Sequence, residues 1–130
     1  MSGELGISDD LRIPGWTSDE DLEGLYALAV ACVFPSLYEG FGLPVLEAMR
    51  RRVPVACSDR SSLPEVAGDA ALTFDPEDVG AITAELERLL GDEQLGERLA
   101  AAGAGQAARF TWQATAEGTL ASYRRALARP

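Results

Sequence analysis

The sequence lacks the residues that most metal and redox sites need. Its 130 residues include no histidine and only two cysteines. Cys32 and Cys57 lie singly inside apolar runs, without the close pairing that is typical of metal ligands or redox-active thiols. We therefore expect two core thiols and no metal site.

Long hydrophobic runs are also missing. The apolar stretches are short and interrupted, so none could span a bilayer, and the N-terminus shows no pattern of a secretory signal peptide. We expect a cytoplasmic protein without a transmembrane segment. With 47% hydrophobic residues and no internal repeat, the chain is long enough for one domain, residues 1–130, with one core.

Positive charge is scarce in this chain. Eleven basic residues against 21 acidic ones give a formal net charge of −10. Such a balance repels a nucleic-acid backbone, whose binding depends on cations that displace its counterions. We therefore expect no nucleic-acid partner.

Short β-rich runs alternate with helical stretches. Strands are predicted at 11–14, 31–34, 53–57 and 71–74, and helices at about 18–29, 42–52, 75–91, 92–109 and 111–128. This order is typical of an α/β fold, and it predicts a Rossmann-like parallel sheet with flanking helices. In the last helix, helical spacing predicts four buried side chains: Trp112, Leu120, Tyr123 and Leu127.

The stretch EGFGLPVLE at 39–47 contains the most informative turn. Gly40 and Gly42 flank Phe41 between a predicted buried strand and a predicted helix. Main-chain amides at such a helix start can approach an anion without obstruction by side chains. The carboxyl edge of a parallel sheet is also where ligands usually bind. The same residues, however, suit an ordinary tight turn.

Two carboxylates bracket this turn. Glu39 precedes the helix, and Glu47 follows about one turn inside it, so both could lie along one extended ligand with the amides between them. A nucleotide diphosphate-sugar, with hydroxyls at both ends and phosphates in the middle, has that layout. The alternative is that Glu47 only complements the positive end of the helix.

Several motifs together resemble one known family, the retaining glycosyltransferases of family 4, or group 1 glycosyltransferases, which have the two-domain GT-B fold. The matching stretches are FPS at 34–36, YEGFGLP at 38–44, LEAM at 46–49, VPVA at 53–56, LPEV at 63–66 and FDP at 74–76. In order and spacing they are similar to the C-terminal, donor-binding half of these enzymes. The resemblance extends from about residue 5 to residue 127.

The resemblance implies roles for the residues of the turn. Glu39 would be the catalytic residue that contacts the donor sugar, and Glu47 would bind the ribose hydroxyls. The donor-binding turn would also include Gly40, together with the diphosphate-binding amides of Phe41, Gly42 and Leu43. The family uses no metal or other cofactor, and the nucleotide diphosphate-sugar is the donor substrate.

Two further positions have less specific signals. Trp16 matches a region that borders the base in the family, although a packing role is equally consistent with the sequence. Arg60 lies in a loop that should face the ligand crevice, where it is the only cation.

The resemblance also shows what this chain does not contain. Family members have a preceding acceptor domain, and their donor domain opens with two central strands and a loop that supplies an Arg and a Lys to the diphosphate. We therefore expect an incomplete donor-binding domain, close to inert by itself. A non-catalytic nucleotide-sugar binding or assembly module is the alternative.

Without the central strands, the strand at 31–34 should have an unpaired edge. Two outcomes are open. The segment 11–13 could shift to pair with this edge, or two chains could associate edge to edge.

Overall fold

A parallel sheet of three strands, in the order β1–β2–β3, forms the centre of the fold. The structure is a computed structural model and describes residues 4–128. The strands are β1 (Cys32–Phe34), β2 (Val55–Ser58) and β3 (Leu72–Phe74). Their register pairs Val33 with Ala56 and Cys57 with Thr73. The predicted α/β fold with a parallel sheet is therefore confirmed.

Helices connect and surround the strands. They are α1 (Asp19–Leu28), α2 (Leu43–Arg50), α3 (Leu63–Ala67), the 3-10 turn η1 (Gly68–Ala70), α4 (Val79–Gly91), α5 (Glu93–Ala107) and α6 (Trp112–Leu127). Capping side chains fix several starts: the carboxylate of Asp78 accepts from the amides of Gly80 and Ala81, and that of Asp92 accepts from the amide of Leu95. For this reason α4 begins at Val79, a few residues later than predicted. No helix among residues 4–128 is both long and apolar enough to cross a membrane.

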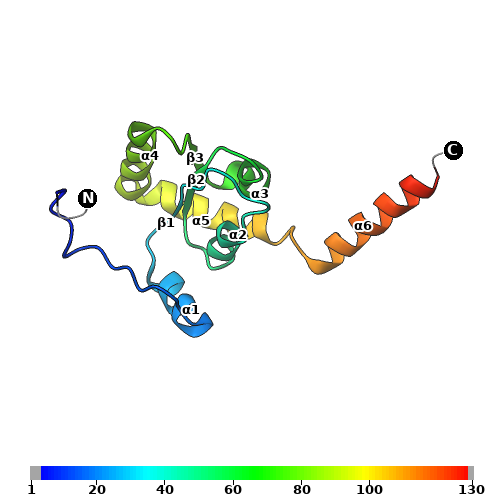
Figure 1. Ribbon diagram of the computed structural model, residues 1–130, viewed down its shortest axis with the longest axis horizontal. Helices are drawn as coiled ribbons and strands as arrows, with labels where there is room; N and C mark the ends of the chain where they lie inside the picture. Colours follow the sequence, from blue (N-terminus) through cyan, green and yellow to red (C-terminus); the bar gives the residue numbers. More distant parts are fainter. Residues whose placement is uncertain (1–3, 129–130) are drawn as a thin grey trace.

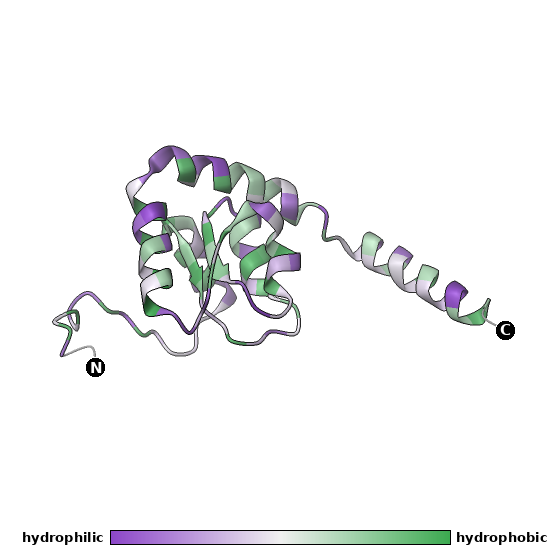
Figure 2. Cartoon of the chain, turned by 90° about the horizontal axis from the view of Figure 1, so that it is seen from above, coloured by the Kyte–Doolittle hydropathy of each residue, from purple (hydrophilic) through white to green (hydrophobic). Residues whose placement is uncertain are grey.

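Helices cover both faces of the sheet. Figure 2 shows the strands, coloured as hydrophobic, between these helices. Alternate residues of β2 serve the two sides: Val55 and Cys57 join a core with α2 and α3, whereas Ala56 joins a second core with α4 and α5. Burial is the main cause that raises the pKa of Cys57, to about 11. Cys32 is half-buried, so the expectation of two core thiols is confirmed.

The segment Leu11–Pro14 forms no strand, which corrects the prediction. Ile13 is 82% exposed, and the segment lies away from the sheet (Figure 1). A strand needs a neighbour to pair its backbone groups, and among residues 4–128 the only strand beside β1 is β2. The alternative in which residues 11–13 shift onto the β1 edge is therefore not seen.

Helix α6 corrects a second prediction. It extends away from the body of the molecule (Figure 1), and its four apolar side chains expected in the core are all exposed, with Trp112 at 89% and Leu127 at 87%. Helical spacing indicates which side chains share a face, but it does not indicate whether the chain provides a surface to cover that face.

Close packing of α2 on α5 depends on a glycine. A Cβ atom added to Gly103 would lie 3.0 Å from Cγ of Met49, a fully buried side chain of α2. The nearby Gly105, on the same helix, has nothing within 4 Å of such an atom. The two glycines therefore differ in packing rather than in secondary structure.

We expect Gly103→Val to destabilise the protein by about 1–3 kcal/mol, because the added side chain overpacks the α2–α5 contact. Gly105→Val is the matched control and should change the free energy of unfolding by no more than about 0.5 kcal/mol, since valine and glycine differ little in helix propensity. Urea unfolding followed by circular dichroism measures both. Equal destabilisation by the two variants would contradict this account.

Candidate functional site

The loop between β1 and α2 carries Glu39 and is fixed from two directions. Oε1 of Glu39 accepts a hydrogen bond of 2.8 Å from the hydroxyl of Ser36. Its backbone oxygen accepts from the hydroxyls of Ser61 (2.7 Å) and Ser62 (3.0 Å), which belong to the loop after β2. Ser61 holds a left-handed backbone conformation, with φ of 59°. Glu39 is therefore positioned by the carboxyl ends of two neighbouring strands.

Gly42 is the N-cap of helix α2, and its backbone is also left-handed, with φ of 105°. Gly42 is buried, and a Cβ atom there would lie 2.6 Å from Cδ2 of Leu63. The amides of Phe41, Gly42 and Leu43 donate no hydrogen bond to any residue between 4 and 128. Pro44, next in the chain, has no N–H. The helix start therefore presents unengaged amides with the chemistry of an anion site.

Glu47 lies one turn into α2 and is half-buried. The hydroxyl of Tyr26, on α1, donates to Oε2 of Glu47 over 3.4 Å. Burial is the main cause that raises the pKa of Tyr26 to about 12, and the negative charge of Glu47 contributes to it. Tyr26 is therefore a neutral donor at physiological pH.

A groove of about 580 Å³ lies along α2, from Leu43 at its start to Arg50 at its end. It is lined by Phe41, Leu43, Leu46, Glu47, Arg50, Phe110, Thr111, Trp112 and Thr115. The rings of Phe41 and Phe110 meet edge to face, 5.8 Å apart between centroids, and Arg50 donates to the backbone oxygen of Phe110 over 2.9 Å. The groove thus combines an aromatic wall with one carboxylate and one guanidinium.

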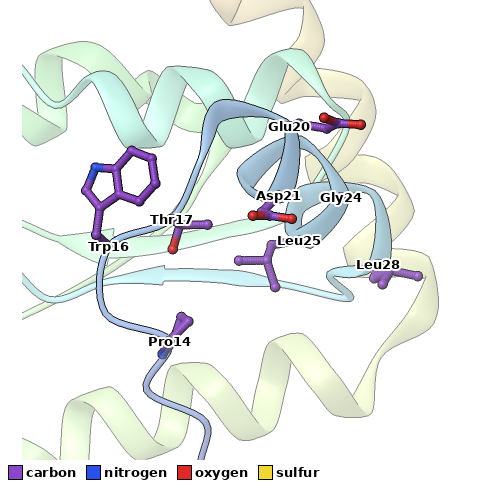
Figure 3. A pocket seen from close by; sticks show the side chains of 8 residues that line it. All are labelled: Pro14, Trp16, Thr17, Glu20, Asp21, Gly24, Leu25 and Leu28. Atoms are coloured by element: carbon purple, nitrogen blue, oxygen red, sulfur yellow. The ribbon is translucent and has the colours of Figure 1, made fainter.

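Trp16 lies elsewhere, 89% exposed on the loop before α1. Figure 3 shows it at a separate pocket of about 490 Å³ over α1. The other lining residues are Pro14, Thr17, Glu20, Asp21, Gly24, Leu25 and Leu28. The structure therefore brings together Phe41, Leu43 and Glu47 in one groove. The other predicted site residues, Glu39, Gly40, Gly42 and Trp16, are not among the residues that line it.

Arg60, the cation expected to face the crevice, is already surrounded by carboxylates. Its guanidinium lies 2.9 Å from Asp75, 3.3 Å from Asp59 and 3.5 Å from Glu77. The pKa of Asp75 is lowered, mainly by the hydrogen bond from the amide of Glu77 and also by Arg60. Arg60 is therefore engaged in local ion pairs rather than free for an anion.

Three residues at this site were not predicted. Ser61 and Ser62 hold the loop of Glu39, and Tyr26 contacts Glu47, over sequence separations of about 20 residues. Only knowledge of which elements are neighbours could have indicated these pairs. Among the residues described, no group of three or more His, Cys, Asp or Glu side chains could hold a metal ion.

Comparison with known proteins identifies the family. Residues 1–106 match the family model of "Glycosyl transferases group 1", and the chain belongs to this family. It is similar to "O-antigen chain mannosyltransferase B" of Escherichia coli, with 49% identity over 138 residues, 95% of this chain and 36% of that protein. It is also similar to "MMP alpha-(1->4)-mannosyltransferase" of Mycolicibacterium hassiacum, with 43% identity over 133 residues, 99% of this chain and 32% of that protein.

Solved structures agree with this assignment. A sucrose-phosphate synthase from Thermosynechococcus elongatus matches with a TM-score of 0.82 and 31% identity, over 98% of this chain and 33% of that one. A glycosyltransferase from Rickettsia africae, at a TM-score of 0.80 and 16% identity, shares the fold. The chain spans about a third of the length of these relatives and structures, so it corresponds to part of a GT-B glycosyltransferase fold.

We expect Gly42→Ala to destabilise the protein by about 1–3 kcal/mol, because the residue must keep a positive φ and its Cβ would overlap Leu63. Gly40→Ala is the matched control, since an added Cβ there meets nothing within 4 Å. Chemical denaturation compares the two. A Gly42→Ala variant as stable as Gly40→Ala would contradict the role of Gly42 in the helix start.

Proposed function

We propose that this chain is the nucleotide-sugar-binding part of a retaining glycosyltransferase, and that it positions a donor for transfer of its sugar to an acceptor. Glu39 contacts the donor sugar, Glu47 binds the ribose hydroxyls, and the amides of Phe41, Gly42 and Leu43 receive the diphosphate. The observation that carries the proposal is the helix start with unengaged amides between two carboxylates.

Electrostatics support this division of roles. Three consecutive amides at the positive end of a helix favour a diphosphate, whereas a carboxylate beside it would repel one. Both glutamates are therefore suited to hydroxyl groups, and a nucleotide-sugar has hydroxyls on both sides of its phosphates. Glu39, fixed by Ser36 and by the loop after β2, is the more rigidly held of the two.

The two similar mannosyltransferases make mannose the first donor sugar to test. These relatives are about three times as long as this chain. Their names describe the activity of the whole proteins, so we assign acceptor binding and the complete reaction to a protein of that length. In isolation we expect the chain to bind a donor but to transfer little. Arg60 is paired with carboxylates, and the loss of a single group that stabilises transition-state charge typically costs about 10²–10³ in rate.

We expect Glu39→Gln to weaken binding of a mannosyl donor about tenfold or more, because a charged hydrogen-bond acceptor for the sugar is lost. Binding of the same nucleoside diphosphate without mannose should not change. Isothermal titration with GDP, UDP and ADP, and then with the mannosyl ester of the tightest binder, measures both values.

Glu47→Gln should weaken the binding of both the nucleoside diphosphate and its mannosyl ester, since each contains the ribose. The exposed Glu87 of α4 provides the control variant Glu87→Gln, which should alter neither affinity. If Glu39→Gln lowers the affinity for both ligands equally, or lowers neither affinity, the assignment of Glu39 to the sugar is refuted.

We also propose that two copies of the chain associate through the outer edge of β1. No strand among residues 4–128 covers that edge, and an apolar strand edge with unpaired backbone groups is a template for another chain. The amide of Cys32 donates to the backbone oxygen of Pro54, on the β2 side. Because successive amides alternate in direction, the amide of Val33 points to the outer edge.

We expect Val33→Pro to abolish a concentration-dependent dimer while leaving the β1–β2 pairing intact, because proline removes only the outward amide. Light scattering over a concentration series measures the association, and thermal melting shows whether the variant is folded. A wild-type chain that is monomeric at every concentration would rule out the dimer.

A further inference from the structure

The hydroxyl of Tyr26 lies between two groups of α2. It is 3.4 Å from Oε2 of Glu47 and 3.4 Å from the backbone oxygen of Pro44. Tyr26 itself belongs to α1, a helix that precedes β1 and otherwise exposes most of its side chains. A phenol hydroxyl has one proton, so these two acceptors share it, and the contact depends on how α1 is held against α2.

Arg51 holds the two helices together at this point. Its guanidinium lies 4.8 Å from the centre of the Tyr26 ring, within the range of a cation–π interaction. The same guanidinium donates to the backbone oxygen of Glu47 over 2.8 Å and is paired with the carboxylate of Glu23 on α1. The Tyr26 ring is thus fixed by a side chain that also contacts Glu47.

The Glu47 carboxylate has one engaged oxygen and one unengaged oxygen. Oε2 accepts from Tyr26, whereas Oε1 accepts no hydrogen bond from residues 4–128. Glu47 also lines the groove along α2. The terminal torsion of a glutamate is broad, so without a fixed partner the carboxylate plane would sample many orientations.

We propose that Tyr26 is a positioning residue for donor binding: its hydroxyl holds Oε2 of Glu47, so that Oε1 is directed to the vicinal hydroxyls of the ribose. This inference rests on the proposed function, which assigns the ribose to Glu47. It adds a residue of α1 outside the motif at 39–47, and it gives α1 a part in recognition of the nucleotide. A phenol with its ordinary pKa of about 10 already keeps its proton at neutral pH, as this role requires, and burial raises the pKa of Tyr26 further.

The test compares a nucleoside diphosphate with its 2′,3′-dideoxy form, which lacks the ribose hydroxyls. The variant is Tyr26→Phe, which removes the hydroxyl and keeps the ring beneath Arg51. We expect about threefold to tenfold weaker binding of the normal nucleotide, as for loss of one hydrogen bond, and unchanged binding of the dideoxy form. Titration calorimetry with the tightest binder among GDP, UDP and ADP measures both affinities on the whole chain.

Tyr123→Phe, on the exposed helix α6, is the matched control and should leave both affinities unchanged. If Tyr26 had only a structural role, Tyr26→Phe would weaken the binding of the two nucleotides equally, and that result would overturn the proposal. The double variant Tyr26→Phe/Glu47→Gln gives a second measurement: it should bind no more weakly than Glu47→Gln alone, since Tyr26 acts through Glu47. If the double variant instead loses the sum of the binding free energies lost by the two single variants, the proposal is also overturned.

Glu47→Gln separates this proposal from the one on which it rests. If Glu47→Gln weakens binding of the normal nucleotide but not of the dideoxy form, and Tyr26→Phe shows no such difference, the proposed function stands and the role of Tyr26 is wrong. If Glu47→Gln does not discriminate, or if none of the three nucleotides binds, the proposed function is wrong, and the inference is wrong with it.

Discussion

The left-handed backbone of Gly42, packed against Leu63, is the constraint on which the site depends. A positive φ at this residue, the last of the connection 35–42 that follows β1, lets the chain turn into α2 at Leu43. It leaves the amides at 41–43 without partners in the described part of the chain, and it sets Glu39 before the turn and Glu47 after it. Any side chain at this position would meet Leu63, so the shape of the turn and the core of α3 are determined together.

Support for the site comes from elements distant in sequence. Ser61 and Ser62, from the loop after β2, fix the backbone of Glu39, and Tyr26 of α1 contacts Glu47. Parallel topology explains the first of these contacts, because the carboxyl ends of adjacent strands lie at one edge of the sheet. The strained backbone of Ser61 is consistent with a loop shaped for this contact rather than for its own conformational preference.

The sequence was informative where local chemistry decides the structure. Continuous apolar runs correctly predicted β1, β2 and β3, and the Gly-Pro turn correctly predicted the start of α2. Predictions that needed a neighbour failed: among residues 4–128, no strand lies beside Leu11–Pro14 and no surface covers the apolar face of α6. The contact of Tyr26 with Glu47 was not predicted for the same reason, since two helices must first be placed side by side.

The charge balance constrains how such a chain could hold an anionic donor. At a net charge of −10, the long-range field repels a diphosphate, and the loop cation Arg60 is neutralised by Asp59, Asp75 and Glu77. In the proposed function, the fixed dipoles of the α2 amides supply an attraction that acts only at contact distance, beside the guanidinium of Arg50 in the groove. Because those dipoles are set by the backbone of Gly42 rather than by a titrating group, their orientation does not change with protonation. In the proposed function, the hydroxyl contacts of Glu39 and Glu47 must therefore place the ligand accurately enough for these short-range dipoles to act on the diphosphate.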